Sequence, residues 1–220
     1  MTIQVETKDC TALTDAELGD MGDICAGRFE FGTLSKARED WVLITLVRLD
    51  DRLHGFSFST LERIGGTPCV LLGLVSVKRN SKRDMVLKAL MSEEYHRALM
   101  AFPDEDVLVG TRFASASGFE AFRALTEVVP RPDHRAVGEE RAWGRRLAKR
   151  FSVEGEYDGQ TFLVKGEGSP APVFDHESSK PEKLDPELVA LFEGTNPDKG
   201  DCLIACGWAM AEDLLKLGSR

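Results

Sequence analysis

The sequence contains the stretch Cys69-Val-Leu-Leu-Gly-Leu-Val-Ser-Val77, followed directly by Lys78-Arg-Asn-Ser-Lys-Arg83. The first run is nearly all apolar, which is typical of a central strand covered on both faces. The second run is basic and leads into a long amphipathic segment, so it predicts a turn into a helix. A further apolar run follows at residues 107–111. Because parallel neighbours need a crossover connection, we expect residues 69–77 and 107–111 to be parallel strands joined by that helix.

The segments on either side supply further elements. Residues 3–6 alternate like a short strand, and Thr14 and Glu17 have the spacing of a capping box that opens a helix. Residues 41–49 and 53–61 are β-branched and aromatic runs joined by turn formers, which predicts a hairpin. The crossover helix places its apolar residues on one face, namely Leu87, Leu90, Met91, Tyr95, Ala98, Leu99 and Phe102. With a last helix opening at Ser115, the expected order over residues 1–125 is β-α-β-β-β-α-β-α.

The remainder, residues 126–220, is less regular. Trp143, Leu147 and Phe151 are spaced by four and predict a helix, and residues 160–165 and 202–206 predict two more strands of the same sheet. Residues 188–192 and 210–217 predict short helices. Residues 166–186 are rich in Gly, Pro, Ser and acids, so we expect a mobile loop that proteases cut first. If this segment proves resistant, we hold a homodimer contact as the explanation. We treat residues 1–220 as a single domain.

Composition narrows the class of protein. Of 220 residues, 42% are hydrophobic and 30% charged, and 28 Lys and Arg against 37 Asp and Glu give a net charge of −9, which weighs against nucleic acid and anionic membranes as partners. No apolar run approaches the roughly 20 residues of a bilayer span. The start, Met1-Thr-Ile-Gln-Val-Glu, lacks the features of a secretory signal, and the five cysteines are an odd, unclustered set. We therefore expect a cytoplasmic protein with buried free thiols and no metal.

The basic turn is the strongest candidate for chemistry. Lys82, Arg83 and their neighbours surround the start of a helix, where backbone amides and the helix dipole favour an anion. Two other interpretations stay open. The cations can be solvated charges with Ser81 and Asp84 as a cap, or they can form a nucleic-acid patch with the basic helix at residues 141–150, against which the net charge counts.

The element order, the stretch from Val77 to Met91 and the stretch Asp106-Val-Leu-Val-Gly-Thr-Arg-Phe-Ala-Ser-Ala-Ser-Gly-Phe-Glu-Ala-Phe122 resemble the GNAT superfamily of acyl-CoA-dependent N-acyltransferases. The resemblance covers a little over half of the chain. It implies an α/β (α+β) fold with a mixed, mainly antiparallel central sheet flanked by helices. It also implies that the fourth and fifth strands are parallel and splay apart to admit the pantetheine arm of acetyl-CoA or another acyl-CoA.

The resemblance also implies a set of CoA-binding residues. Val75 and Val77 lie at the splaying end of the fourth strand. The family turn has the form (Q/R)-x-x-G-x-(G/A), and one register places Lys82, Met85 and Leu87 on its defined positions, while another starts at Arg79 and uses Lys82 and Asp84. Arg83 lies between them. Neither register contains the glycine that lets backbone approach a phosphate. The family tyrosine that protonates the leaving thiolate corresponds to Phe122, which has no proton to donate.

The resemblance supplies no acid or base here, so the candidates for these roles are chosen by residue type and position in the sequence. Ser115 or Ser117 can position a thiol or water, or can simply cap the helix that they open. The amine must lose a proton, for which Glu62 and His54 are the candidates closest to the expected acceptor side. The leading hypothesis is direct acyl transfer to a small-molecule or peptide amine. The alternative is a catalytically inactive GNAT-like module that binds a ligand or partner, so the residues leave open whether the chain is an enzyme.

Overall fold

The computed structural model describes residues 2–218, and its nine described strands form one sheet. The N-terminal half is an antiparallel meander in which each strand pairs with the next. It consists of β1 (Ile3–Asp9), β2 (Leu43–Leu49), β3 (Arg52–Ile64) and β4 (Thr67–Val77). The predicted hairpin and central strand are confirmed, and β4 is buried along nearly its whole length.

The C-terminal half of the sheet is built around β5 (Val107–Phe113) and β9 (Cys202–Ala209), which are antiparallel. Two short strands, β6 (Thr126–Val129) and β7 (Leu163–Val164), also pair with β9. Both late strands that the sequence predicts are thus confirmed as members of the sheet.

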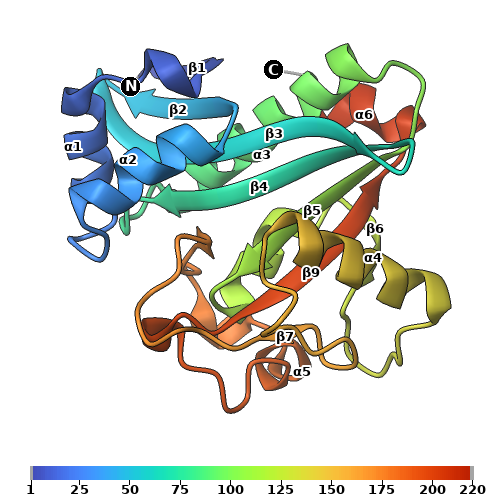
Figure 1. Cartoon of the computed structure of the whole chain (residues 1–220). Helices are drawn as coiled ribbons and strands as arrows, with labels where there is room; N and C mark the ends of the chain where they lie inside the picture. Colours follow the sequence, from blue (N-terminus) through green and yellow to red (C-terminus); the bar gives the residue numbers. More distant parts are fainter. Residues whose placement is uncertain (1, 219–220) are drawn as a thin grey trace.

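The two halves meet where β4 and β5 run parallel. Cys69, Val70 and Leu71 pair with Leu108, Val109 and Gly110, and beyond this point the strands separate. A short strand, β8 (Phe174–Asp175), lies in the gap and pairs with both of them. Figure 1 shows the two halves diverging from this seam. The predicted fold class, including the parallel and splayed strands, is confirmed.

Helices cover both faces of the sheet (Figure 1). One face carries α1 (Asp15–Ile24), α2 (Phe31–Asp40) and α4 (Gly138–Arg150), and the other carries α3 (Arg83–Ala101), the 3-10 helix η2 (Ala116–Phe122) and α6 (Ala211–Leu217). Glycines in the strands allow this close packing. A Cβ on Gly55 would lie 2.5 Å from Val86 of α3, and one on Gly110 would lie 2.8 Å from Leu147 of α4.

Several local predictions can be compared with the structure. The Thr14 and Glu17 capping box is present, and all five cysteines are free and buried. The helix α2 was not predicted from the sequence. The helix expected at Ser115 is a 3-10 helix, and the Ser115 side chain makes no capping hydrogen bond, so its predicted capping role is wrong.

The segment 166–186, predicted to be a mobile loop, contains β8 and the 3-10 helix η3 (Pro181–Lys183). Val173, Phe174, His176 and Ser178 in this segment are buried against their own chain. Its mobility in solution stays a prediction, but the structure gives it an intramolecular packing site. The remaining short helices are η1 (Cys10–Ala12), α5 (Pro186–Ala190) and η4 (Pro197–Lys199). No helix within residues 2–218 is both long and apolar enough to traverse a bilayer.

Candidate functional site

The candidate site is the splay between β4 and β5, and a piece of the chain itself occupies it. We call residues 173–180 the strap. Val75 of β4 and Phe113 of β5 both pair with Phe174 of the strap, and Ala114 N–H donates to the Phe174 carbonyl over 3.0 Å. The strap therefore takes the hydrogen bonds that the two strands would make to each other had they stayed together.

An aromatic cluster anchors the strap. The Phe174 side chain is fully buried and meets the Phe113 ring edge to face at a centroid distance of 5.3 Å. The same Phe113 ring packs against Phe119 and Phe122 of η2, each at 4.9 Å. Phe122, which the sequence placed at a cofactor position, is thus a core residue beside the strap. Burying Phe174 contributes on the order of 2 kcal/mol to holding the strap in place.

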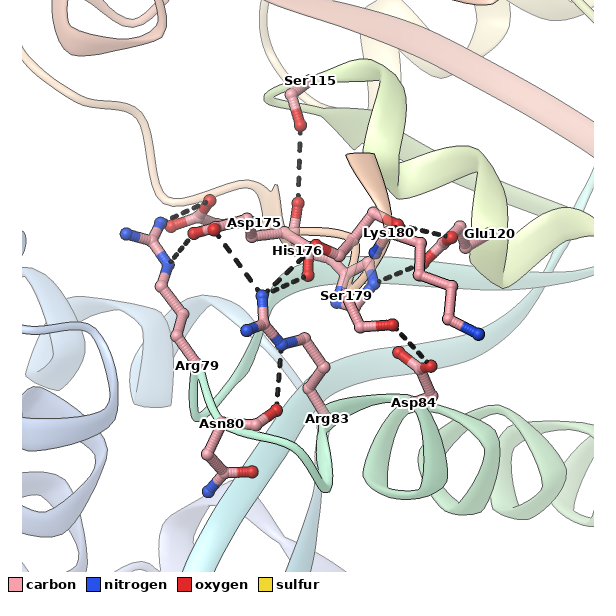
Figure 2. Close-up of polar contacts among 12 residues, drawn as sticks. Arg79, Asn80, Arg83, Asp84, Ser115, Glu120, Asp175, His176, Ser179 and Lys180 are labelled. Atoms are coloured by element: carbon pink, nitrogen blue, oxygen red, sulfur yellow. Dashed lines mark hydrogen bonds and ion pairs between the residues drawn. The ribbon is translucent and has the colours of Figure 1, made fainter. Parts of the chain in front are cut away.

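The start of α3 binds the strap backbone (Figure 2). Arg83 Nη1 donates to the carbonyl oxygens of Glu177 and Ser178, at 3.2 and 3.3 Å, and its Nε donates to the carbonyl of Asn80 at 2.9 Å. Asp84 accepts a hydrogen bond from Ser179 Oγ at 2.8 Å. The predicted residues Arg83 and Asp84 are therefore brought together, with the strap as their partner.

Carboxylates of the strap form ion pairs with the two arginines of the basic turn, Arg79 and Arg83. Asp175 lies 3.4 Å from Arg28 and 3.7 Å from Arg79, and Glu177 lies 3.0 Å from Arg79 and 3.6 Å from Arg83. The anion that the sequence predicts at this turn is thus supplied within the chain. Cys25 is close to the same charges, and burial raises the pKa of its thiol to about 12, so it stays protonated.

The helix η2 holds the strap from the other side. Glu120 Oε2 lies 2.8 Å from His176 Nε2, and Glu120 Oε1 accepts a hydrogen bond from Ser178 Oγ at 2.8 Å. Ser115 Oγ donates to the His176 carbonyl over 3.4 Å, a long bond. Figure 2 shows these contacts on either side of the strap.

A cavity of about 500 Å³ lies on the α3 face, and two residues that hold the strap, Asp84 and Glu120, are part of its wall. Asp84 and Leu87, two of the predicted cofactor residues, line it together with Lys88, Glu120 and Arg123. Val77 is buried in its pair with Gly55, Met85 is partly buried, and Lys82 is an exposed residue before α3. The α3 face therefore combines a hollow with several of the residues that the sequence indicated.

The two predicted bases lie apart from each other. Glu62 pairs with Cys69, near the start of β4 and away from the splay, and accepts a hydrogen bond from Arg150 Nε of α4. His54 lies beside the turn that follows β4, with Nδ1 3.4 Å from Asn80 Nδ2. Burial and the charge of Lys78 lower the pKa of His54, so its ring is neutral at neutral pH. The geometry favours His54 over Glu62 as a base near the splay.

Sequence reasoning missed the strap, His176 and Glu120. The only signal in the sequence is charge complementarity, since Asp175 and Glu177 are acidic where the turn at Arg79 is basic. Within residues 2–218 the structure has no cluster of three His, Cys, Asp or Glu side chains that could hold a metal.

No protein-family model matches the sequence, and no curated protein matches it. Among solved structures, the ribosomal-protein-S18-alanine N-acetyltransferase from Escherichia coli is similar, with a TM-score of 0.48 at 9% identity over 94% of this chain and 95% of that chain. The aminoglycoside 6'-N-acetyltransferase from Enterococcus faecium gives a TM-score of 0.43 at 8% identity over 93% and 96%. A putative acetyltransferase of the GNAT family from Desulfovibrio desulfuricans gives 0.40 at 13% over 96% and 99%.

These values are low and concern the fold alone. The stronger observation is the topology itself. The mainly antiparallel sheet flanked by helices and the parallel strands β4 and β5 that part after Leu71 are the features of the predicted fold class, which the structure therefore confirms.

Proposed function

We propose that the protein is an acyl-CoA-dependent N-acyltransferase that transfers an acyl group directly to the amine of a small molecule or peptide. The observation that carries this proposal is the splay of β4 and β5, together with a 500 Å³ cavity on the α3 face whose wall includes Asp84 and Glu120, two residues that hold the strap in the splay. A gap between parallel strands offers unpaired backbone groups to an extended ligand, and the adjoining hollow offers room for the rest of it.

As arranged, the strap fills the splay, so an acyl-CoA fits there only when the strap leaves. Leaving would uncover the backbone of Val75 and the N–H of Ala114, which now bond the strap. Such an N–H can donate to the carbonyl of a thioester and stabilise the negative charge that develops on its oxygen. Arg79 and Arg83 would exchange the strap's carboxylates and carbonyls for the phosphates of the donor.

The reaction forms a C–N bond and breaks the C–S bond of the thioester, so the amine must give up a proton and the thiolate must gain one. His54 is the base that we favour, because its ring is neutral and lies beside the turn. Ser115 loses its bond to the His176 carbonyl when the strap leaves and can then position the thiolate or a water. Acetyl-CoA is the simplest donor.

One observation favours a second candidate, a GNAT-like module without turnover. The strap is held by an aromatic anchor, by ion pairs and by hydrogen bonds to both α3 and η2. The turn also lacks glycine, and Phe122 stands where the family tyrosine would donate a proton. A splay that is closed in this way is consistent with a protein that binds a partner through its outer surface and binds no ligand between β4 and β5.

The experiment that separates the two candidates weakens the strap without altering the residues that would bind the donor. The variant Asp175→Asn/Glu177→Gln removes the strap's charge from the basic turn, and Glu182→Gln/Glu187→Gln changes two exposed acids outside the strap as a control. Calorimetric titration with CoA, acetyl-CoA and longer acyl-CoAs measures binding, and release of thiol in the presence of an amine panel measures turnover. An N-acyltransferase binds acyl-CoA more tightly in the strap variant and releases thiol. Binding without thiol release contradicts turnover, and no binding by the strap variant at about millimolar ligand contradicts the acyl-CoA proposal and supports the module.

A further inference from the structure

A second cavity, of about 340 Å³, lies on the face of the sheet opposite α3. Its walls come from α2, from β5, from the chain that follows α4 and from residues 169–172, which lead into the strap. Arg112 of β5 lines it, two residues along the strand from Gly110, which faces α4. Alternation along a strand places Arg112 on that same face. The cavity is therefore separate from the hollow beside α3.

Arg112 is held in place by aromatic packing. Its guanidinium carbon lies 5.2 Å from the centroid of the Phe151 ring, and Phe151 in turn lies 6.5 Å from the Trp41 ring. The N–H groups of a guanidinium lie in its own plane, so a guanidinium that packs on an aromatic face keeps these donors free for a ligand. Burial lowers the pKa of Arg112, yet an arginine stays protonated at neutral pH.

Arg112 has no hydrogen bond and no ion pair with any residue in the described part of the chain. Every other partly buried arginine between residues 2 and 218 forms an ion pair with a carboxylate: Arg28, Arg38, Arg48, Arg83, Arg97, Arg131 and Arg150. A half-buried charge without a partner is costly, so an exception needs a reason. The position of Arg112 in the wall of a cavity is such a reason, because an anion bound in the cavity would be the missing partner of its guanidinium.

The neighbours of Arg112 do not supply that anion. Burial raises the pKa of Cys202 to about 11, so this thiol is neutral beside the guanidinium. Asp201 already accepts from Lys165 Nζ at 3.2 Å and from the backbone N–H groups of Gly166 and Asn196. Glu156 and Glu167 line the cavity as exposed residues.

We propose that this cavity binds a small molecule that carries a single carboxylate, held by the fork of the Arg112 guanidinium. A planar guanidinium matches a carboxylate with two parallel hydrogen bonds. Val153, Val164 and Ala171 in the wall offer apolar surface to a short aliphatic tail. Lys36 and Lys165 also line the cavity, so together with Arg112 and the two exposed glutamates the wall carries a net charge of +1, which suits a ligand with one negative charge better than a phosphate with two. The proposal does not depend on acyl transfer, since it concerns the other face of the sheet.

The test follows the Arg112 side chain directly. The Nε–Hε signals of the arginines are recorded by NMR in the full chain, and the Arg112 signal is assigned with Arg112→Lys. The protein is then titrated with 4-methylpentanoate, L-leucine, isopentylamine and inorganic phosphate. We expect both carboxylates to shift the Arg112 signal with saturation, and the amine and phosphate to leave it in place. Arg112→Gln should weaken carboxylate binding about tenfold or more, while the exposed control Arg52→Gln binds like the parent.

Three results would overturn the proposal. One is an Arg112 signal that neither carboxylate moves at about 50 mM, a concentration that detects even weak sites. Another is carboxylate affinity that is unchanged in Arg112→Gln, as followed by backbone amide shifts. The third is phosphate binding more tightly than both carboxylates, which would make the ligand class wrong. If Arg112→Gln fails to fold, the titration of the parent protein and Arg112→Lys still decide the question.

Discussion

His176 Nε2 and Glu120 Oε2 lie 2.8 Å apart although 56 residues separate them in the sequence. The same carboxylate accepts a hydrogen bond from Ser178 Oγ, so one side chain of η2 holds two groups of the strap. His176 and Ser178 are both buried, and buried polar groups that lose their partners cost more than the bond itself is worth. Glu120 is therefore a principal contact of the closed strap.

Replacing Glu120 with Gln should loosen the strap. Gln can still accept one hydrogen bond but carries no charge, and the loss is on the order of 1 to 3 kcal/mol of closing free energy. Hydrogen exchange at the Ala114 amide, which donates to the Phe174 carbonyl, reports opening of the strap and should become faster. The exposed Glu127→Gln serves as a control. Unchanged exchange at Ala114 in Glu120→Gln would show that η2 does not hold the strap.

Arg83 and Lys82 form a matched pair for a second prediction. They are neighbours in the sequence and both are basic, but only Arg83 donates hydrogen bonds to the strap backbone. Arg83→Gln should therefore speed exchange at Ala114 and lower the melting temperature, whereas Lys82→Gln should do neither. One interpretation that the sequence left open is that both side chains are solvated charges, in which case the two substitutions would have the same small effect. Equal effects of the two substitutions would contradict the role of Arg83 in holding the strap.

The crossing of Gly166 and Gly200 predicts a large steric effect. A Cβ on Gly166 would lie 2.0 Å from the Lys199 carbonyl oxygen, which is backbone and has no room to move aside. Gly166→Ala should cost on the order of 2 kcal/mol or more, and so lower the melting temperature by several degrees. Gly155→Ala is the control, because a Cβ there would have no heavy atom within 4 Å. A melting temperature equal to that of the control would argue against this crossing.

Glu94 of α3 predicts a dependence of stability on pH. Burial raises the pKa of its carboxyl to about 7 from 4.5, and this effect outweighs the neighbouring hydroxyl groups of Ser57, Ser59 and Thr45, which favour the charged form. The folded state therefore favours the protonated acid. This contribution is fully present below about pH 4.5 and is lost as pH rises through about 7, with a total of the order of 3 kcal/mol.

Glu94→Gln imitates the protonated form and should remove this loss. Urea unfolding at about pH 5 and about pH 8 measures the effect. Relative to the parent protein, the variant should gain stability at the higher pH, and the exposed Glu156→Gln should follow the parent at both values. The prediction would be contradicted if the difference in stability between Glu94→Gln and the parent protein were the same at both pH values.

Local patterns predicted most of the fold because they act over short distances. The apolar run of β4, the period of α3 and the Thr14 capping box are each contained in a few residues. The helix α2 was missed because Glu30 before it makes no side-chain capping bond, so the start carries no signal. The strap was missed because its contacts are remote, as Arg83 lies 94 residues from Glu177. A polar segment with Pro and Gly looks like a loop until its partner is known.

The candidate site followed the same division. The sequence located Arg83, Asp84 and Leu87 next to the splay because they follow β4 directly. It did not locate His176 or Glu120, whose burial depends on where the strap lies. Glu62 was chosen for its place on the third strand, but the register sets it opposite Cys69, at the far end of β4 from the gap.

The strap is a tethered competitor, and tethering changes what an affinity measurement reports. A ligand that needs the open splay has an apparent dissociation constant equal to its intrinsic value divided by the fraction of open molecules. If about 1% of molecules are open, a micromolar site behaves as a site of about 100 μM. A binding screen at low micromolar ligand would then detect no binding, even though the protein can bind the ligand. Because the strap and the sheet belong to one chain, the strap is always present at the splay, and a ligand for the splay has to exceed a threshold concentration before its binding is detected.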